Sequence, residues 1–184
     1  MRKSTASTAT HWQQIPSVIQ NELRSSHAGE LGAVWIYRGI LLASQFNQVR
    51  AFARQHLATE KTHLALFEES IHLYRGSLLL PVWIVAGFLT GFIPALFGRK
   101  AVFKTIETVE SFVEKHYQHQ IQLLSQFPHL RALQGMLEFC QQDEIAHKQE
   151  ASELAQESSG LILSTWCWLV SHGSKIAVSI AKRV

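Results

Sequence analysis

The stretch that decides the fold is Glu60-Lys61-Thr62-His63, which the chain repeats later as Glu144-Ile145-Ala146-His147. Positions i and i+3 of an α-helix project from the same side, so the Glu oxygen and the His nitrogen of each copy can approach one ion together. One such motif is weak evidence, because solvent-exposed helices are rich in both residue types. Its meaning depends on the segments in which the two copies lie.

Four segments predict long amphipathic helices, because apolar residues and acids recur along them at alternating steps of four and three. Each segment carries one Glu on its apolar stripe. The expected helices and their acids are residues 17–48 with Glu30, 49–74 with Glu60, 100–127 with Glu110, and 129–158 with Glu144. These acids would meet in one interior, which predicts an all-α, ferritin-like four-helix bundle.

On the third of these helices, periodicity alone does not choose among Glu107, Glu110 and Glu114, which lie one turn apart. We prefer Glu110 as the inward-facing acid, because Val109 and Val113 flank it on the apolar row.

Four ionised carboxylates in one apolar interior would lose their hydration and repel one another, which is very costly. Two divalent cations would balance the four charges, with His63 and His147 completing the ligand set. Mixed imidazole and carboxylate ligation suits iron or manganese, and we expect two iron ions. Two reduced irons can deliver electrons to dioxygen, which fits oxidase, hydroxylase or ferroxidase chemistry.

Further polar residues lie near the predicted ligands along the helices. His27, one turn before Glu30, and His116 and Tyr117, about two turns after Glu110, suit supporting or proton-handling roles, with ordinary hydrogen-bonded helix residues as the alternative. The histidines interpreted as ordinary structural residues are His56, His72, His119, His129 and His172.

Length and composition predict a single domain over residues 16–184, because 184 residues that are 47% hydrophobic can bury a sizeable core. Residues 1–15 are expected to form a frayed tail without the apolar run of a secretory signal, with a short transit peptide as the alternative. The net charge of +3 is spread over scattered Lys and Arg residues, which gives no support for nucleic-acid binding. Cys140 and Cys167 make no C-x-x-C pair and are expected to be reduced.

Residues 76–98 form an uncharged stretch between two basic positions. At ~1.5 Å per residue they would reach ~35 Å, enough to cross a ~30 Å hydrocarbon core. Spanning would separate the predicted ligand helices across the bilayer, so the metal site could not assemble. The residues expected to break the stretch into shorter pieces are Pro81, Gly87, Gly91 and Pro94. This favours a crossover segment in the membrane interface, although spanning stays open as the alternative.

Residues 161–180 carry apolar and aromatic side chains, and basic residues follow toward the end of the chain. This pattern suits a helix that rests on anionic lipid. A sixth helix that covers the bundle is the alternative.

Taken in order, these residues resemble the demethoxyubiquinone hydroxylase family of ubiquinone biosynthesis over roughly residues 15–184. The resemblance depends on His27-Ala28-Gly29-Glu30, Glu60-Lys61-x-His63-Leu64, Pro81-Val82-Trp83, Val109-Glu110, His116-Tyr117-x-x-Gln120-Ile121 and Asp143-Glu144-x-x-His147. It implies iron ligation by Glu30, Glu60, His63, Glu110, Glu144 and His147, which matches the set expected from spacing. Two departures are Ser26 and Ser111, where the family usually has acids.

The resemblance also implies a di-iron monooxygenase that hydroxylates the ring of a polyprenyl benzoquinol with dioxygen. Residues 76–98 would form an apolar entry whose Pro and Gly residues leave room for the tail. Electrons would come from NADH, a reductase or the quinol itself. The implied location is peripheral, on the cytoplasmic face of a bacterial inner membrane or the matrix face of the mitochondrial inner membrane, within a ubiquinone-biosynthesis assembly. The alternative functions are a ferritin-like iron-storage or peroxide-scavenging protein and a non-enzymatic quinone-binding assembly protein.

Overall fold

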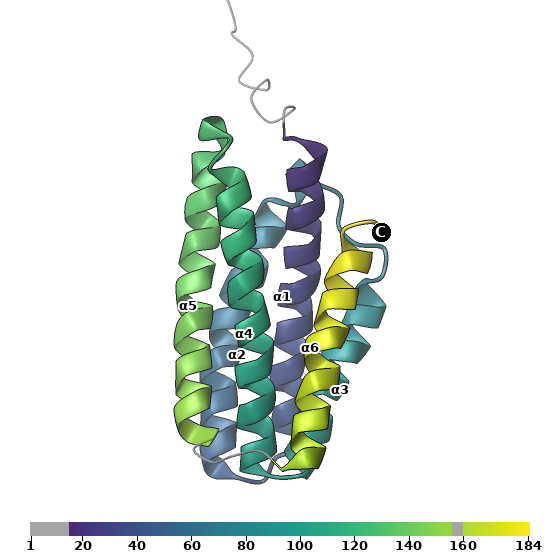
Figure 1. Cartoon of the computed structure of the whole chain (residues 1–184), viewed down its shortest axis with the longest axis vertical. Helices are drawn as coiled ribbons and strands as arrows, with labels where there is room; N and C mark the ends of the chain where they lie inside the picture. Colours follow the sequence, from purple (N-terminus) through teal and green to yellow (C-terminus); the bar gives the residue numbers. More distant parts are fainter. Residues whose placement is uncertain (1–14, 156–159) are drawn as a thin grey trace, which may run out of the picture.

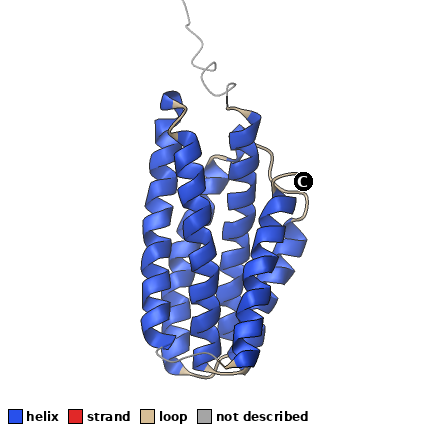
Figure 2. Ribbon diagram, viewed as in Figure 1, coloured by secondary structure: helices blue, strands red, loops and turns tan. Residues whose placement is uncertain are grey.

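Every regular element of the described chain is helical (Figure 2), which confirms the expected all-α class for this part. The computed structural model describes residues 15–155 and 160–184. Its elements are α1 (Ser17–Ala43), α2 (Asn47–Glu69), the 3-10 turn η2 (Ile71–Leu73), α3 (Leu80–Leu96), α4 (Arg99–Leu124), the 3-10 turn η3 (Pro128–Leu130), α5 (Arg131–Ala155) and α6 (Leu161–Ala181). The predicted frayed tail, apart from Ile15, lies outside the described residues, as do 156–158 at the end of the fourth predicted helix.

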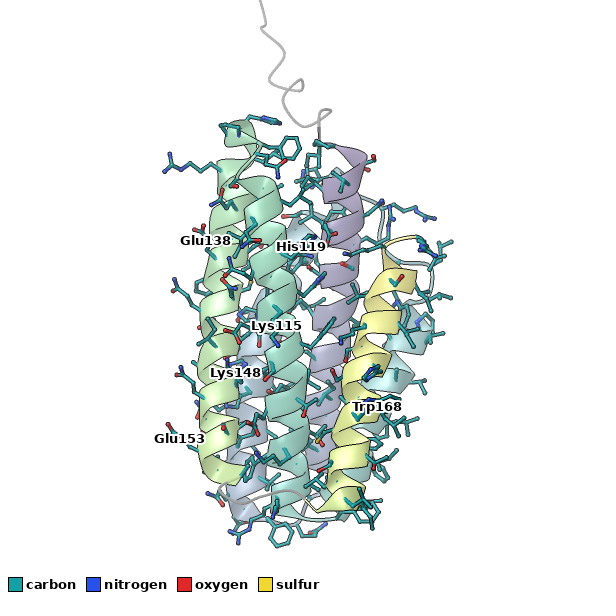
Figure 3. The ribbon with its side chains drawn as sticks, in the orientation of Figure 1. Lys115, His119, Glu138, Lys148, Glu153 and Trp168 are labelled. Carbon is teal, nitrogen blue, oxygen red and sulfur yellow. The ribbon has the colours of Figure 1, made fainter. Side chains whose placement is uncertain are left out.

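Helices α1, α2, α4 and α5 form an elongated bundle, and α3 and α6 lie together along one of its sides (Figure 1). Charged side chains such as Lys115 and Lys148 follow the outer faces of α4 and α5 (Figure 3). The bundle interior contains two apolar clusters, represented by Ile40 and Phe103 in one and by Leu23 and Leu137 in the other. On each of the four helices, the predicted acid falls between the residues of these two clusters. The acids thus form a polar belt with apolar packing on both sides.

The boundary between the first two helices lies earlier than expected, because α1 ends at Ala43 and α2 already begins at Asn47. Side-chain hydrogen bonds mark the end of α1, where the sequence has no Gly or Pro to indicate it. The Ser44 hydroxyl accepts a hydrogen bond from the Phe46 backbone N–H at 3.3 Å, and the Arg50 guanidinium donates to the Ser44 carbonyl at 3.0 Å. The expectation that α1 continues to residue 48 was therefore wrong.

Helix α3 is one continuous helix, so the expectation that prolines and glycines break residues 76–98 was wrong. Pro81 lies in its first turn, where a missing N–H costs nothing, and Pro94 lies in its last turn. The glycines are contact sites with α1. A Cβ at Gly87 would lie 2.3 Å from the Gly32 carbonyl oxygen, and one at Gly91 would lie 1.9 Å from the Ile36 carbonyl oxygen. These two glycines leave no room for a ligand, because the backbone of α1 occupies the space beside them.

Helix α6 packs on the bundle and still exposes one side. The Trp166 indole donates a hydrogen bond to the Thr105 hydroxyl of α4 at 2.8 Å, and the Arg24 guanidinium of α1 donates to the Lys182 carbonyl at 2.7 Å. The side turned away from the bundle exposes apolar residues, among them Leu161 and Ile162. Within residues 15–155 and 160–184, no helix combines the length and the apolar character needed to cross a membrane.

Candidate metal centre

The polar belt brings together the six residues that the sequence predicts as metal ligands. Each of them is at most 4% exposed: Glu30 on α1, Glu60 and His63 on α2, Glu110 on α4, and Glu144 and His147 on α5. Such burial of charged residues is rare unless they are paired or bind a cation.

The six residues divide into two overlapping groups, in each of which one ligand atom per residue lies within 4.8 Å of the others. The His63 group contains Glu30, Glu60, His63 and Glu144. The His147 group contains Glu60, Glu110, Glu144 and His147. Glu60 and Glu144 belong to both groups, while Glu30 and Glu110 each belong to one.

Both imidazoles direct Nδ1 toward the carboxylates. The Nδ1 atom of His63 lies 3.1 Å from Glu144 Oε1 and 3.6 Å from Glu30 Oε2. The Nδ1 atom of His147 lies 3.2 Å from Glu60 Oε1 and 3.2 Å from Glu144 Oε2. Each histidine therefore contacts a carboxylate from the opposite Glu-x-x-His motif, which joins α2 to α5.

Several atoms of this cluster are buried without a partner in hydrogen-bond geometry. They are Glu30 Oε2, Glu60 Oε1 and Oε2, Glu144 Oε2 and His147 Nδ1. Buried polar atoms in folded proteins are nearly always paired, so this group of unpaired acceptors fits the binding of a cation. Oxygen and imidazole donors at this spacing fit two divalent ions of the first transition series.

Without a cation, protons must balance the charge of the cluster. Burial, and then the neighbouring Glu144 carboxylate, raise the pKa of Glu60 and of Glu110 well above the ordinary value. Burial alone would lower the pKa of His63 and of His147, but the surrounding carboxylates outweigh it and raise both. Burial would likewise raise the pKa of Glu144, yet the two imidazoles lower it to about 2.

Two tyrosines hold Glu30 and Glu110, the two carboxylates that each belong to only one of the groups. The Tyr37 hydroxyl on α1 donates to Glu110 Oε1 on α4 at 3.2 Å, and the Tyr117 hydroxyl on α4 donates to Glu30 Oε1 on α1. Burial raises the pKa of both tyrosines, so both hydroxyls keep their protons as donors. Each tyrosine lies two turns after the glutamate of its own helix. This second repeat, beyond Glu-x-x-His, is the sequence signal that would have identified Tyr37 together with Tyr117.

Comparison with known proteins yields a family. The family model described as "Ubiquinone biosynthesis protein COQ7" matches residues 17–181. The chain belongs to the COQ7 family. It is 31% identical over 170 residues to the "NADPH-dependent 3-demethoxyubiquinone 3-hydroxylase, mitochondrial" of Dictyostelium discoideum, covering 91% of this chain and 78% of that protein.

Two further relatives agree with this assignment. The "3-demethoxyubiquinol 3-hydroxylase" of Rhodospirillum rubrum is 31% identical over 175 residues, covering 91% of this chain and 79% of that protein. The "NADPH-dependent 3-demethoxyubiquinone 3-hydroxylase, mitochondrial" of Caenorhabditis elegans is 29% identical over 173 residues, covering 91% of each chain. The resemblance drawn from the motifs is thereby confirmed for nearly the whole length of this COQ7-family chain.

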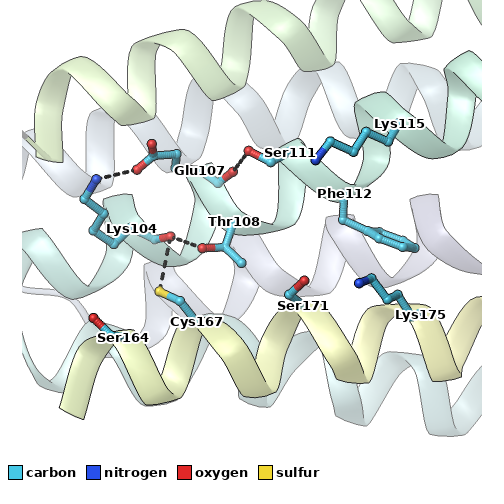
Figure 4. Close-up of a pocket in the computed structure, with 10 residues that line it drawn as sticks. All are labelled: Lys104, Glu107, Thr108, Ser111, Phe112, Lys115, Ser164, Cys167, Ser171 and Lys175. Atoms are coloured by element: carbon cyan, nitrogen blue, oxygen red, sulfur yellow. Dashed lines mark hydrogen bonds and ion pairs between the residues drawn. The ribbon is translucent and has the colours of Figure 1, made fainter. Parts of the chain in front are cut away.

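The structure also separates Glu110 from the two acids one turn away. Glu107 pairs with Lys104 of its own helix at 2.7 Å, at the rim of a cavity of about 510 Å³ between α4 and α6 (Figure 4), and it accepts a hydrogen bond from the Ser152 hydroxyl of α5 at 3.1 Å. Glu114 pairs with Lys148 of α5. Both are engaged at the outer side of α4, so only Glu110 of the three lies in the belt.

The predicted supporting residues fall into two classes. Tyr117 contacts Glu30 directly, as described above. His116 instead lies 3.1 Å from the Ser25 hydroxyl, and His27 stands edge-on to Tyr74. Among the described residues, no hydrogen bond or ion pair joins His27 or His116 to the six belt residues, so their proton-handling role stays a prediction.

The two serines that depart from the family pattern make contacts outside the cluster. The Ser26 hydroxyl donates to Gln120 at 2.9 Å, and the Ser111 hydroxyl donates to the Glu107 carbonyl of its own helix at 2.6 Å. Each serine is thus satisfied by the bundle without touching the belt carboxylates.

Proposed function

We propose that this chain is a di-iron 3-demethoxyubiquinol 3-hydroxylase, a monooxygenase that adds one oxygen atom from dioxygen to the ring of a polyprenylated benzoquinol. Membership of the COQ7 family and the names of the hydroxylase relatives support the reaction. The observation that carries the metal assignment is the pair of overlapping Glu and His groups that share Glu60 and Glu144.

In this proposal the six belt residues Glu30, Glu60, His63, Glu110, Glu144 and His147 hold two iron ions. When bound, the irons supply the electrons and the oxygen activation that a ring hydroxylation needs. Glu60 and Glu144 belong to both groups and would join the two positions, and Glu30 and Glu110 would each serve one. The charges then balance, because four carboxylates face two divalent cations.

The protein's own residues supply the surroundings in which this chemistry can take place. The apolar clusters on both sides of the belt exclude water along the bundle axis, which strengthens every electrostatic contact between them. Tyr37 and Tyr117 hold the carboxylates of Glu110 and Glu30 in fixed orientations. Asp143 does the same for His63, because its carboxylate accepts a hydrogen bond from His63 Nε2 at 3.0 Å.

Access for a lipid-borne substrate is proposed from the side of the bundle that carries α3 and α6 (Figure 1). Both helices expose apolar residues on this side: Leu78, Val82, Val85, Leu89, Leu96 and Phe97 in or beside α3, and Leu161, Ile162, Trp168, Leu169, Ile176 and Ile180 on α6. So large an exposed apolar surface is typical of contact with a partner or a membrane. Lys175 on α6 adds positive charge that attracts anionic lipid. The proposed location is therefore peripheral, at a membrane that contains the quinol.

The proposed reductant is NADPH, in line with the names of the Dictyostelium discoideum and Caenorhabditis elegans relatives. The donors expected from the resemblance, with no preference among them, were NADH, a reductase and the quinol itself.

The test is a reaction of iron-loaded protein with a short-tailed demethoxyubiquinol under ¹⁸O₂, in separate samples with NADPH, with NADH and with the quinol alone. The expected product carries one ¹⁸O atom on its ring, and Glu144→Ala abolishes it. Iron mineral or peroxide loss without ring oxidation would favour an iron-storage or scavenging protein. Unchanged ubiquinone levels in cells that rely on the Glu144→Ala variant would favour a non-enzymatic assembly protein.

A further inference from the structure

His56 is one of the five histidines for which an ordinary structural role was expected from the sequence, but in the structure it lies against a residue of the polar belt. It lies on α2, one turn before Glu60, and is 3% exposed. Its ring centroid lies 4.0 Å from that of His147 on α5, with the ring planes at 74°. A belt imidazole therefore rests against the His56 ring.

His56 also contacts Tyr37, the tyrosine that supports Glu110 in the same His147 group. Its ring stacks with the ring of Tyr37, with centroids 5.8 Å apart and planes at 28°. Tyr37 in turn donates to Glu110. His56 thus touches His147 directly and also touches the tyrosine that holds Glu110. His147 and Glu110 are the two residues present in the His147 group and absent from the His63 group.

The orientation of the His56 ring is fixed from α5. His56 Nε2 lies 3.0 Å from Glu150 Oε2, and because a carboxylate accepts, Nε2 carries the hydrogen. Phe52, one turn earlier on α2, packs against the ring with centroids 4.1 Å apart. The imidazole is therefore held by packing on one side and by a hydrogen bond at its tip.

We propose that His56, locked by Glu150, is a positioning residue for one metal position, the one bounded by Glu110 and His147. The other position is supported differently, since Asp143 holds His63 and Tyr117 holds Glu30. The two metal positions therefore depend on separate sets of supporting contacts. This inference assumes the proposed metal centre and assigns a role within it to two residues outside the ligand set.

The test is a titration of the metal-free full chain with Co²⁺, followed by visible absorption and calorimetry. Glu30→Ala and Glu110→Ala each remove a ligand of one group only, and so assign the two binding steps. Loss of supporting contacts typically weakens metal affinity about 10- to 100-fold. In His56→Phe and in Glu150→Ala we expect this weakening of Co²⁺ affinity at the binding step that Glu110→Ala removes, together with a changed Co²⁺ spectrum. The Co²⁺ affinity of the step that Glu30→Ala removes should stay within about twofold of wild type.

Two matched variants separate positioning from general stability. Glu150→Gln keeps an oxygen that can accept from His56 and is expected to restore most of the affinity. Glu153→Ala removes an exposed acid from the same helix, directed away from the bundle (Figure 3), and is expected to change neither step. Glu150 is 40% exposed, so its variants test the proposal even if His56→Phe does not fold.

Three results would overturn the inference. Glu150→Ala could behave like Glu153→Ala, or both binding steps could weaken equally, and each would leave His56 without a selective role. A wild-type chain that binds no Co²⁺ would instead contradict the metal centre itself. The first two leave the proposed centre in place, so the two failures are distinguishable.

Discussion

The Tyr37 hydroxyl on α1 donates a hydrogen bond to the Glu110 carboxylate on α4 across 3.2 Å. Tyr117 on α4 returns the same contact to Glu30 on α1. Each helix therefore holds the acid of the other, and the two hydrogen bonds fix the orientation of both carboxylates within the polar belt. The cluster is thus preorganised by the bundle before any metal enters it.

Replacing Tyr37 with Phe should weaken metal binding by about 10- to 100-fold, because Glu110 loses the donor that orients it. Calorimetric titration with Fe²⁺ under argon measures the change. Tyr74→Phe is the control, since that hydroxyl bonds to the Phe67 carbonyl at 2.8 Å, away from the belt. It should cost about 1 kcal/mol of stability and leave metal affinity unchanged. Equal metal affinities for Tyr37→Phe and wild type would refute this role.

Gly91→Ala should destabilise the protein by about 1–3 kcal/mol, because the added Cβ would lie 1.9 Å from the backbone oxygen of Ile36, which cannot move freely. Gly135→Ala is the matched control in α5, where a Cβ meets nothing within 4 Å. It should stabilise by up to about 1 kcal/mol through helix propensity. Urea unfolding curves of both variants measure the difference. Similar stabilities for the two would contradict the close contact of α3 with α1.

The metal-free protein should lose stability as pH rises above neutrality. Burial raises the folded-state pKa of Glu60 and Glu110, so their contribution is present below the unfolded pKa and is lost as pH rises through the folded pKa. The raised pKa values of His63 and His147 act in the same direction. Glu144, whose pKa is lowered, contributes above its unfolded pKa and changes little near neutrality.

Thermal melts of metal-free protein between pH 6 and pH 9 check this direction. Metal-loaded protein should show the opposite trend, because ligands must lose protons to bind and affinity therefore rises with pH. A metal-free protein whose melting temperature rises across this range would show that the belt is not balanced by protons.

The candidate site was more predictable from sequence than its surroundings. Glu30, Glu60, Glu110 and Glu144 could be placed together because helical periodicity fixes which side of a helix a residue occupies, and each acid interrupts an apolar row. Periodicity also puts His56 on this face, one turn before Glu60, but it could not predict which residues the ring contacts. Its contacts with His147 and Glu150 join α2 to α5, and periodicity within one helix carries no information about contacts between helices.

Helix α3 is a second case in which local sequence rules could not predict contacts between helices. Its composition indicated an uncharged apolar segment, and local rules assigned Gly87 and Gly91 the role of breaks. In the fold, the backbone of α1 passes so close that only glycine fits, and packing between helices overrides the local preference. The end of α1 at Ala43 was hidden for a related reason, since it depends on side-chain bonds from Arg50 and Ser44.

The exposed apolar residues of α6 should bind lipid. Replacing Leu161 and Ile162 together with Ser should reduce binding to vesicles that contain anionic phospholipid by at least about tenfold, at about 25 cal/mol per Å² of apolar area kept from lipid. Flotation with such vesicles measures the bound fraction. Val18→Ser removes an exposed apolar residue of α1 and is the control. If the double variant floats as wild type does, the apolar side of α6 serves another partner.

The most direct test of the account is the iron content of chains loaded with Fe²⁺ under argon and freed of excess metal, measured beside Glu110→Ala. The account predicts about two irons per chain in the wild type and about one in the variant, because Glu110 belongs only to the His147 group. A wild-type chain that retains no iron, or a variant that retains as much as the wild type, would contradict it.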